Sequence, residues 1–184
     1  MDDSAKNARV VLTGGPGAGK TAVLAELNAM GYTTVEDSAR AIIAERLARG
    51  ASPRPDPRLF AREILRRDID KYRAQPRTSQ WVFFDRGLID ALGLLQEVGP
   101  LPAHERRATL AAYPFHPTVF VFPPWEAIYV NDAERDQSFT DATIVYDKIV
   151  RWYRACGYIV HDVPRLSVAQ RALHILERLT ESAA

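Results

Sequence analysis

The amino-acid sequence predicts a single α/β domain with an open, mainly parallel sheet that is covered by helices on both faces. Three observations carry this prediction. The chain has 184 residues, a length typical of one domain. Its composition, with 47% apolar and 26% charged residues, is close to that of soluble globular proteins. Short apolar runs alternate with segments of helical periodicity, and these runs lack the polar alternation of a half-exposed sheet.

Strands and helices are expected to alternate along the chain. The expected strands are residues 9–13, 32–35, 81–84, 118–122 and 158–160. The expected helices are residues 20–30, 37–49, 59–73, 88–98, 143–155 and 166–179. Residues 51–57 contain three prolines and indicate a loop. Right-handed crossovers bring the polar ends of the strands to one edge of the sheet, where we expect the active site.

The bulk composition excludes several classes of function. Lys and Arg (24) nearly balance Asp and Glu (23), so no global field would attract nucleic acid or a membrane. The longest uncharged stretch, residues 109–125, is broken by prolines and is too short to cross a bilayer. Residues 1–8 predict a flexible tail without a signal peptide. With Cys156 as its single cysteine, the chain is expected to be cytoplasmic. The expected oligomeric state is a monomer or a homodimer.

The segment GGPGAGKT at residues 14–21 matches the phosphate-binding pattern GxxxxGK[ST] in full. Its glycines allow the backbone to turn several amides toward an anion, and the helix that follows adds its positive end. Lys20 is expected on the β and γ phosphates and Thr21 on magnesium. The predicted nucleotide-binding residues are Gly14, Gly15, Gly17, Ala18, Gly19, Lys20 and Thr21.

Two alternatives to this phosphate loop are weaker. A glycine-rich turn without function is disfavoured because the motif follows an apolar strand directly and opens a helix. A dinucleotide-binding fold is disfavoured because the third glycine of GxGxxG is missing.

An acid and an arginine follow the third predicted strand. Asp85 ends the run WVFF as a Walker B acid would, reaching magnesium through water; capping of the next helix is its alternative role. Arg86 can hold phosphates or substrate, with a surface salt bridge as its alternative. Because ATP-driven motors carry glutamate at this position, Arg86 favours phosphoryl transfer over motor hydrolysis.

Further polar residues follow the second strand. Asp37 could take a proton from an acceptor hydroxyl, and Arg40 would lie on the same helix face. Capping of that helix by Asp37 or Ser38 is the competing interpretation. Whether Glu36 or Asp37 acts as the base stays open.

The polar segment at residues 131–141 predicts a lid over about residues 126–141, because phosphoryl transfer requires exclusion of water. Arg135 is the candidate catalytic cation of this lid, and a solvated loop without such an arginine is the alternative. The four histidines show no metal-ligand spacing.

The phosphate loop, EDSAR at 36–40, FFDRGLID at 83–90 and GYIVHDVP at 157–164 together resemble a known family. This is the AAA-like ATPase/kinase family that includes the ribosylnicotinamide kinase domain of NAD-biosynthesis regulators. The resemblance implies a P-loop NTPase fold with strand order 2-3-1-4-5. It also implies roles for the acid after strand two, for the Asp-Arg pair, for an acid soon after it and for an arginine in the lid. These roles fall on Asp37, Asp85, Arg86, Asp90 and Arg135, and Pro164 would border the adenine.

The leading functional hypothesis is a small-molecule kinase formed by residues 9–184. It would use ATP and Mg²⁺ to phosphorylate a hydroxyl of a nucleoside-like or other small metabolite, with Glu36, Arg40 and Asp90 near the acceptor. GTP is less expected because no NKxD motif is present. The alternative is a nucleotide-binding regulatory ATPase or GTPase module with slow hydrolysis. A nucleic-acid enzyme is disfavoured by the balanced charge.

Overall fold

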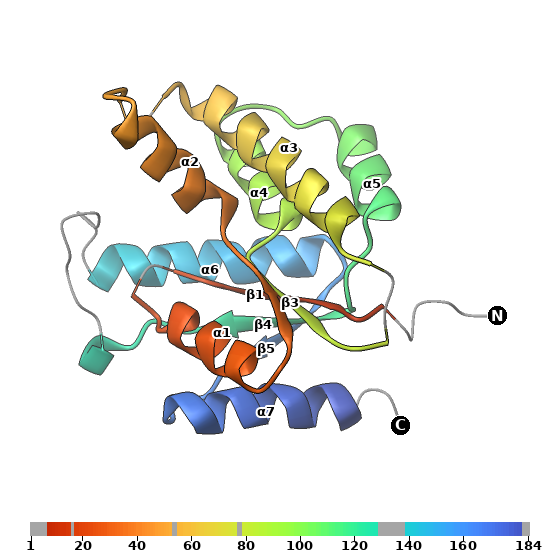
Figure 1. The fold of residues 1–184 in the computed structure, drawn as a ribbon. Coiled ribbons are helices and arrows are strands. Elements are labelled where there is room, and N and C mark those ends of the chain that lie inside the picture. Colours follow the sequence, from red (N-terminus) through yellow and green to blue (C-terminus); the bar gives the residue numbers. More distant parts are fainter. Residues whose placement is uncertain (1–6, 16, 53–54, 77–78, 129–138, 182–184) are drawn as a thin grey trace. The chain divides into compact units, whose positions relative to one another are not determined.

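The computed structural model describes residues 7–15, 17–52, 55–76, 79–128 and 139–181, and Figure 1 labels its elements. The strands are β1 (Arg9–Gly14), β2 (Thr33–Val35), β3 (Val82–Asp85), β4 (Thr118–Phe122) and β5 (Ile159–Asp162). The α-helices are α1 (Lys20–Ala29), α2 (Ser38–Ala48), α3 (Pro57–Ala74), α4 (Leu88–Glu97), α5 (Ala103–Ala112), α6 (Phe139–Ala155) and α7 (Val168–Glu181). A short 3₁₀ turn, η2, spans Glu126–Ile128.

The strands form one sheet in the order β2-β3-β1-β4-β5. β1 pairs in parallel with β3 on one side and with β4 on the other, and β5 pairs in parallel with β4. In this register Leu12 of β1 lies opposite Asp85 of β3 and Phe120 of β4. The predicted α/β fold class and its strand order are therefore confirmed.

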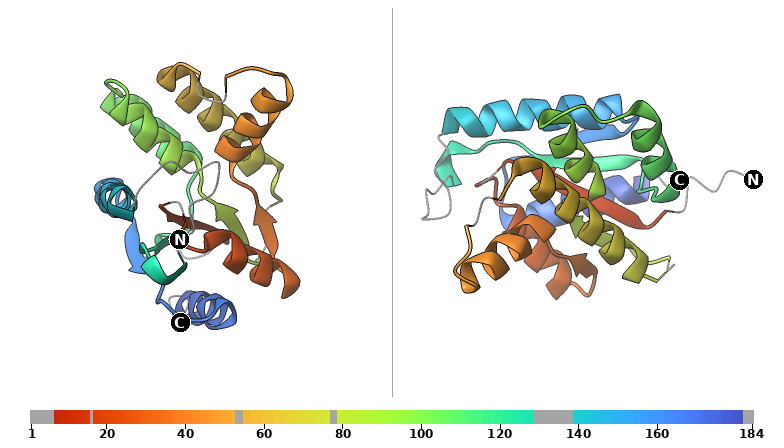
Figure 2. Two further views of the ribbon diagram at one scale, coloured as in Figure 1. Left: turned by 90° about the vertical axis from the view of Figure 1, so that its left-hand side faces the viewer. Right: turned by 90° about the horizontal axis from the view of Figure 1, so that it is seen from above.

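The contacts of the chain group into two compact units. The first comprises residues 1–34, 78–85 and 115–184, and it contains β1, β3, β4 and β5 with α1, α6 and α7. Within this unit, α1 and α7 lie side by side on one face of the sheet, and α6 lies on the other (Figures 1 and 2). Covering helices on both faces explain why β1, β3 and β4 are almost entirely buried, whereas the edge strand β5 is more exposed.

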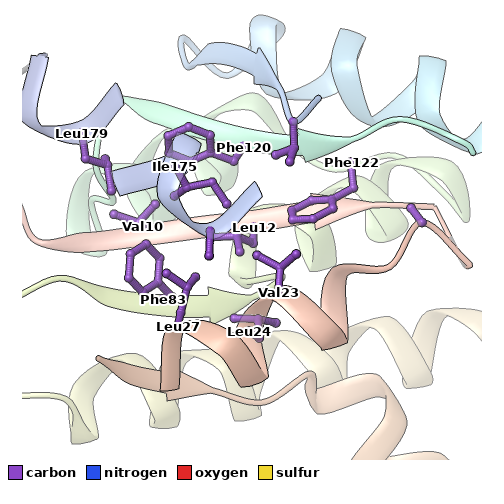
Figure 3. Close-up of a cluster of buried hydrophobic side chains, with 13 residues drawn as sticks. Val10, Leu12, Val23, Leu24, Leu27, Phe83, Phe120, Phe122, Ile175 and Leu179 are labelled. Carbon is purple, nitrogen blue, oxygen red and sulfur yellow. The ribbon is translucent and has the colours of Figure 1, made fainter. Parts of the chain in front are cut away.

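The main core of the first unit lies between the sheet and the pair α1 and α7 (Figure 3). Val10 and Leu12, two residues apart on β1, point to this face because side chains alternate along a strand. Leu27 from α1 and Ile175 from α7 pack against them, and all four side chains are fully buried. The apolar faces of α1 and α7 therefore pack into the same hydrophobic core.

The second unit comprises residues 35–77 and 86–114, and it contains α2, α3, α4 and α5. Asp56 caps α3 by accepting hydrogen bonds from the amides of Arg58 and Leu59 at 3.0 and 2.9 Å, and Pro57 occupies the first turn. Buried Ile42, Ile64 and Ala91 join α2, α3 and α4. This unit has its own small apolar core.

Helix α5 was not predicted from the sequence. None of its residues is buried, so it carries no apolar stripe from which a helix could be recognised. Helix α6 starts at Phe139, four residues before the expected start, so the last three residues of the expected lid are helical. Residues 1–6 of the expected tail and 129–138 of the expected lid lie outside the described residues, whereas Ala8 is buried and accepts a hydrogen bond from Val82. In the described residues no helix combines the length and apolarity needed to span a membrane.

Ile175→Ala tests the core of the first unit. The side chain is fully buried, so its removal leaves a cavity and should lower the free energy of unfolding by about 2–5 kcal/mol. Leu173→Ala on the same helix is the matched control, because Leu173 is 49% exposed and should change stability by less than about 1 kcal/mol. Urea unfolding measures both, and an equal loss in the two variants would contradict the described packing of α7.

Candidate functional site

The phosphate loop leaves the end of β1 with a backbone that only glycine accommodates. Gly14 has φ 149°, and a Cβ at this position would lie 2.8 Å from the carbonyl oxygen of Phe122. Gly17 has φ 73° and Gly19, the N-cap of α1, has φ 78°. The glycines of the motif thus serve both the turn and the close approach of β4, as an amide nest for phosphate requires.

A buried arginine from α7 supports the loop. Arg171 is 4% exposed, and its Nη1 donates a hydrogen bond to the carbonyl of Ala18 at 3.3 Å. Its guanidinium lies 5.5 Å from the centre of the Trp125 ring, within the range of a cation–π contact. A Cβ on Gly19 would come within 2.8 Å of Arg171 Nη1. Burial lowers the pKa of Arg171. Sequence analysis had not identified this residue.

Lys20 and Asp85 form a buried ion pair. Lys20 Nζ bonds to Asp85 Oδ1, and the two side chains are 5% and 9% exposed. The lysine stands at the start of α1, the helix that follows β1 along the chain. The aspartate stands at the end of β3, which lies next to β1 in the sheet. The predicted phosphate-loop lysine and Walker B acid are therefore brought together.

The oxygen atoms at this point suit magnesium. Thr21, an exposed residue directly after Lys20, carries a hydroxyl, and Asp85 provides a carboxylate, both of the hard oxygen type that Mg²⁺ prefers. In the described ranges no cluster of three His, Cys, Asp or Glu side chains could hold a metal by itself. A Mg²⁺ ion here would take its remaining ligands from water and nucleotide phosphates, as is usual for this ion.

Arg86 adopts φ 62°, a left-handed conformation that non-glycine residues rarely adopt and that clusters at functional sites. Its Nη1 lies 3.9 Å from Asp37 Oδ2, and its side chain is 30% exposed. Asp85 and Arg86 are consecutive, yet the first pairs with Lys20 and the second faces Asp37. The left-handed backbone of Arg86 therefore occurs where two consecutive side chains are directed to different partners.

Asp37 differs from its neighbour Glu36 in burial. Asp37 is 7% exposed, and its Oδ1 accepts a hydrogen bond from the amide of Ala39 at 2.8 Å. Glu36 and Arg40 are exposed, and the carbonyl of Glu36 accepts a hydrogen bond from Lys71 Nζ at 2.6 Å. Asp37 therefore caps α2, as the competing interpretation proposed, while its other oxygen faces Arg86.

Asp85 and Asp90 differ in their relation to the start of α4. The N-cap of α4 is Gly87, so the alternative role of Asp85 as a helix cap is wrong. Asp90, in the first turn, accepts a hydrogen bond at Oδ2 from the amide of Gly87 at 3.1 Å. Asp90 thus stabilises the helix start through at least one of its oxygens.

Asp68 of α3 is a further acid that the sequence analysis missed. Burial raises the pKa of its carboxyl to about 7. The Ser38 hydroxyl beside it and the ammonium of Lys71 lower this pKa, whereas the carboxylates of Asp90 and Asp37 raise it further. The second unit therefore brings acids from three helix segments near one another, and one of them retains a proton near neutral pH.

A cavity of about 630 Å³ opens at the ends of β4 and β5 in the first unit. It is lined by Pro123, Pro124, Phe139, Thr143, Tyr146, Asp147, Asp162, Val163, Pro164 and Arg165. The predicted adenine neighbour Pro164 is among them. The Tyr146 hydroxyl donates a hydrogen bond to Asp162 Oδ1 at 2.6 Å, and burial with this carboxylate raises the pKa of Tyr146. Arg135 of the lid lies outside the described residues.

The two missed residues share one sequence signal. Arg171 precedes Ile175 and Leu179 at intervals of four, so it stands on the buried stripe of α7. Asp68 occupies the same kind of position on α3, four residues after buried Ile64 and four before buried Tyr72. A charged side chain within an apolar helical stripe could have indicated both residues.

Asp68→Asn tests the raised pKa of Asp68. In wild type the raised pKa lets the folded state keep this proton up to about pH 7, whereas the unfolded state loses it near the ordinary aspartate pKa of 3.8. The folded state therefore binds more protons, and this group lowers stability progressively as the pH rises from about 4 to about 7. The stability gained by Asp68→Asn over wild type should grow across this interval and then level off.

Thermal melts at several pH values measure this difference. Asp70→Asn is the control for the substitution, because Asp70 lies on the same helix with an exposed side chain. A gain that does not depend on pH, or one that shrinks as the pH rises, would contradict the assigned environment of Asp68.

Solved structures of several kinases share this fold. A NadR protein in complex with NR superimposes with a TM-score of 0.70 at 17% identity, covering 96% of this chain and 52% of that one. Deoxyadenosine kinase from M. mycoides matches with a TM-score of 0.62 at 12% identity, covering 94% and 98% of the two chains. Thymidylate kinase from Candida albicans matches with a TM-score of 0.61 at 8% identity, covering 97% and 94%.

The present chain spans about half the length of the NadR chain. No curated protein sequence matches it. A family model described as an AAA domain matches residues 9–171, from the first residue of β1 to Arg171 on α7. This match includes the phosphate loop, Asp37 and the Asp85-Arg86 pair. The chain therefore belongs to this AAA-domain family and has the P-loop fold of nucleoside and nucleotide kinases.

Proposed function

We propose that this chain is an ATP-dependent small-molecule kinase that transfers the γ-phosphoryl group to a hydroxyl of a nucleoside-like acceptor. One observation carries the proposal. The consecutive residues Asp85 and Arg86 serve two different partners, the phosphate-loop Lys20 and the buried acid Asp37. The residues proposed for the phosphate donor and those proposed for the acceptor are thus linked through two consecutive positions of the chain.

The donor side consists of the loop, Lys20 and the two magnesium ligands. The amides after Gly14 and the ammonium of Lys20 hold the phosphates, and Thr21 and Asp85 hold Mg²⁺. Magnesium neutralises charge on the migrating phosphoryl group. When a triphosphate binds, its oxygens compete with Asp85 for Lys20. Lys20 then exchanges the carboxylate for the phosphates and keeps a negatively charged partner.

The proposed location of the nucleotide base is the cavity beside this loop. Phe122 contacts Gly14 and is followed by Pro123 of the cavity, while Ala142 contacts Gly15 and is followed by Thr143 of the cavity. The cavity therefore lies beside the start of the phosphate loop. Its proline and valine side chains provide an apolar surface for a purine, and Pro164 is one of them.

Asp37 is the proposed acceptor-side base. It is the buried member of the pair Glu36 and Asp37, and its Oδ2 is directed toward Arg86. A carboxylate that orients an acceptor hydroxyl and receives its proton completes the transfer, and Arg86 stabilises negative charge on the migrating group. Arg135 of the lid is proposed as a second such cation.

The test is turnover with an acceptor. Labelled ATP is incubated with the protein, Mg²⁺ and a panel of nucleosides, including ribosylnicotinamide, together with sugars and vitamins. Labelled product with one of them is the expected result. Slow phosphate release that no acceptor accelerates would instead favour the alternative, a regulatory ATPase or GTPase module. The same assay with GTP establishes the choice of donor.

Lys20→Ala should weaken triphosphate binding by about tenfold or more, or abolish transfer, because the loop loses its full positive charge. Calorimetric titration with ATP and the transfer assay measure the two effects. Lys148→Ala, an exposed lysine on α6, is the control. The variant also leaves Asp85 buried without its lysine, so folding is checked by circular dichroism. Wild-type binding and transfer would overturn the assigned role of the loop.

Asp37→Asn should lower turnover by about 10²–10⁴-fold while ATP binding stays unchanged, because the amide cannot take the acceptor proton. Asparagine also caps helices well, so the start of α2 should be preserved. Glu36→Gln is the matched control and should retain turnover, since Glu36 is exposed. The reverse ranking of the two variants would make Glu36 the base, and a loss of ATP affinity alone would move Asp37 to the nucleotide site.

A further inference from the structure

The guanidinium of Arg171 is a buried charge without a carboxylate partner in the described part of the chain. The residue is 4% exposed, and among the described residues no Asp or Glu forms an ion pair with it. Its Nε is buried and has no hydrogen-bond partner there either. A buried charge that is not paired lowers stability. The packing of α7 therefore gives no reason for a cation at this position.

The partner that Arg171 does have is the phosphate loop. Its Nη1 donates a hydrogen bond to the carbonyl of Ala18 at 3.3 Å. Ala18 belongs to the same buried apolar cluster as Ala172, the next residue of α7. A Cβ on Gly19 would come within 2.8 Å of Nη1 and 3.2 Å of Nη2 of Arg171. The guanidinium thus lies against the peptide group that joins Ala18 to Gly19.

This peptide group carries its two polar atoms on opposite sides. The described peptide bonds include no cis bond, and in a planar trans peptide the carbonyl and the amide point in opposite directions. Arg171 occupies the side of the Ala18 carbonyl, so the Gly19 amide faces away from the guanidinium. The same amide is one of those that the GxxxxGK motif directs to phosphate. A cation on the carbonyl also polarises the peptide, which makes its amide a stronger hydrogen-bond donor.

The side chains around this contact limit the access of water. The Trp125 ring centre lies 5.5 Å from the guanidinium of Arg171, and Ile128 Cδ1 would lie 2.9 Å from a Cβ on Gly19. Both residues belong to the segment that follows β4. A charge in surroundings of low dielectric constant acts more strongly on a nearby anion than a solvated charge does. Arg171 is therefore placed to act on phosphates across the thickness of one peptide group.

We propose that Arg171 is a positioning residue for the nucleotide phosphates. It acts through the Ala18–Gly19 peptide, whose orientation it fixes with the Gly19 amide directed to phosphate. Its positive charge attracts the phosphates through the loop, in addition to the charge of Lys20. The phosphates in turn supply the negative charge that no described carboxylate supplies. This inference deepens the proposed function: it rests on nucleotide binding by the loop, and phosphoryl transfer is not required for it.

ADP binding tests this role without requiring turnover. Calorimetric titration compares wild type with Arg171→Met, Arg171→Lys and Arg178→Met. Methionine keeps a long apolar side chain and removes the charge. Arg178→Met is the matched control, because Arg178 lies on the same helix with its side chain 47% exposed and the variant has the same net charge. Circular dichroism establishes that each variant is folded.

Arg171→Met should weaken ADP binding by about tenfold or more, since the loop loses a charge-assisted contact. Arg178→Met should bind ADP as wild type does. A loss of affinity confined to Arg171→Met supports the inference. Unchanged ADP affinity in Arg171→Met, or an equal loss in Arg178→Met, would overturn it, and so would the absence of ADP binding by wild type.

Arg171→Lys separates the charge from the space that the side chain fills. Arginine stays protonated throughout the experiment, whereas burial lowers the pKa of a lysine at this position. The ADP affinity of this variant relative to wild type should therefore fall as the pH rises from about 6 to about 9. Ionisation of ADP itself affects both proteins and cancels in the ratio. A ratio that does not change with pH would overturn the inference, and this profile decides alone if Arg171→Met does not fold.

Failure of the kinase proposal is a separate result. ADP binding that depends on Arg171, together with no labelled product from any acceptor, would refute phosphoryl transfer and leave this inference intact. Labelled product from an Arg171→Met protein that binds ADP as wild type does would have the opposite meaning.

Discussion

The buried ion pair between Lys20 and Asp85 is the interaction on which the rest of the site depends. Both side chains are nearly inaccessible to solvent, so each charge needs the other, and removal of one partner leaves an expensive bare charge. The pair holds the start of α1 to the end of β3, and β1 lies beside β3 in the sheet. We propose that the oxygens of a bound triphosphate take the place of the carboxylate as partners of the lysine.

Close packing around the phosphate loop imposes a second constraint. Gly14 has no room for a Cβ because β4 approaches it, and Gly19 has none because Arg171 and Ile128 approach from the other side. The loop is therefore held by β4, by η2 and by α7 at once, although these elements are distant in sequence. A loop fixed in this way keeps its amides oriented before the phosphates arrive, which reduces the ordering cost of binding.

Arg171 and Asp68 show how a candidate site departs from the rules of a core. Arg171 and Asp68 stand on apolar helical stripes, where side chains of this kind lower stability unless they are paired or used. Arg171 is used by the loop, through the Ala18 carbonyl and the Trp125 ring. Asp68 lies near the proposed base Asp37. Local violations of consistency of this sort are expected where function has been selected over stability.

Most residues of the proposed phosphate-donor site were predictable from local sequence, and most residues near the proposed acceptor site were not. The glycine loop, Lys20 and Asp85 were recognisable because their spacing along the chain already dictates a strand, a turn and a helix start. The alternation of strands and helices likewise indicated a parallel sheet. Helix α5 escaped notice because it buries no side chain, and the proposal of Asp37 in preference to Glu36 as the base required knowledge of which one is buried. Arg171 and Asp68 acquire their roles from partners far away in the sequence, so only tertiary packing could assign them.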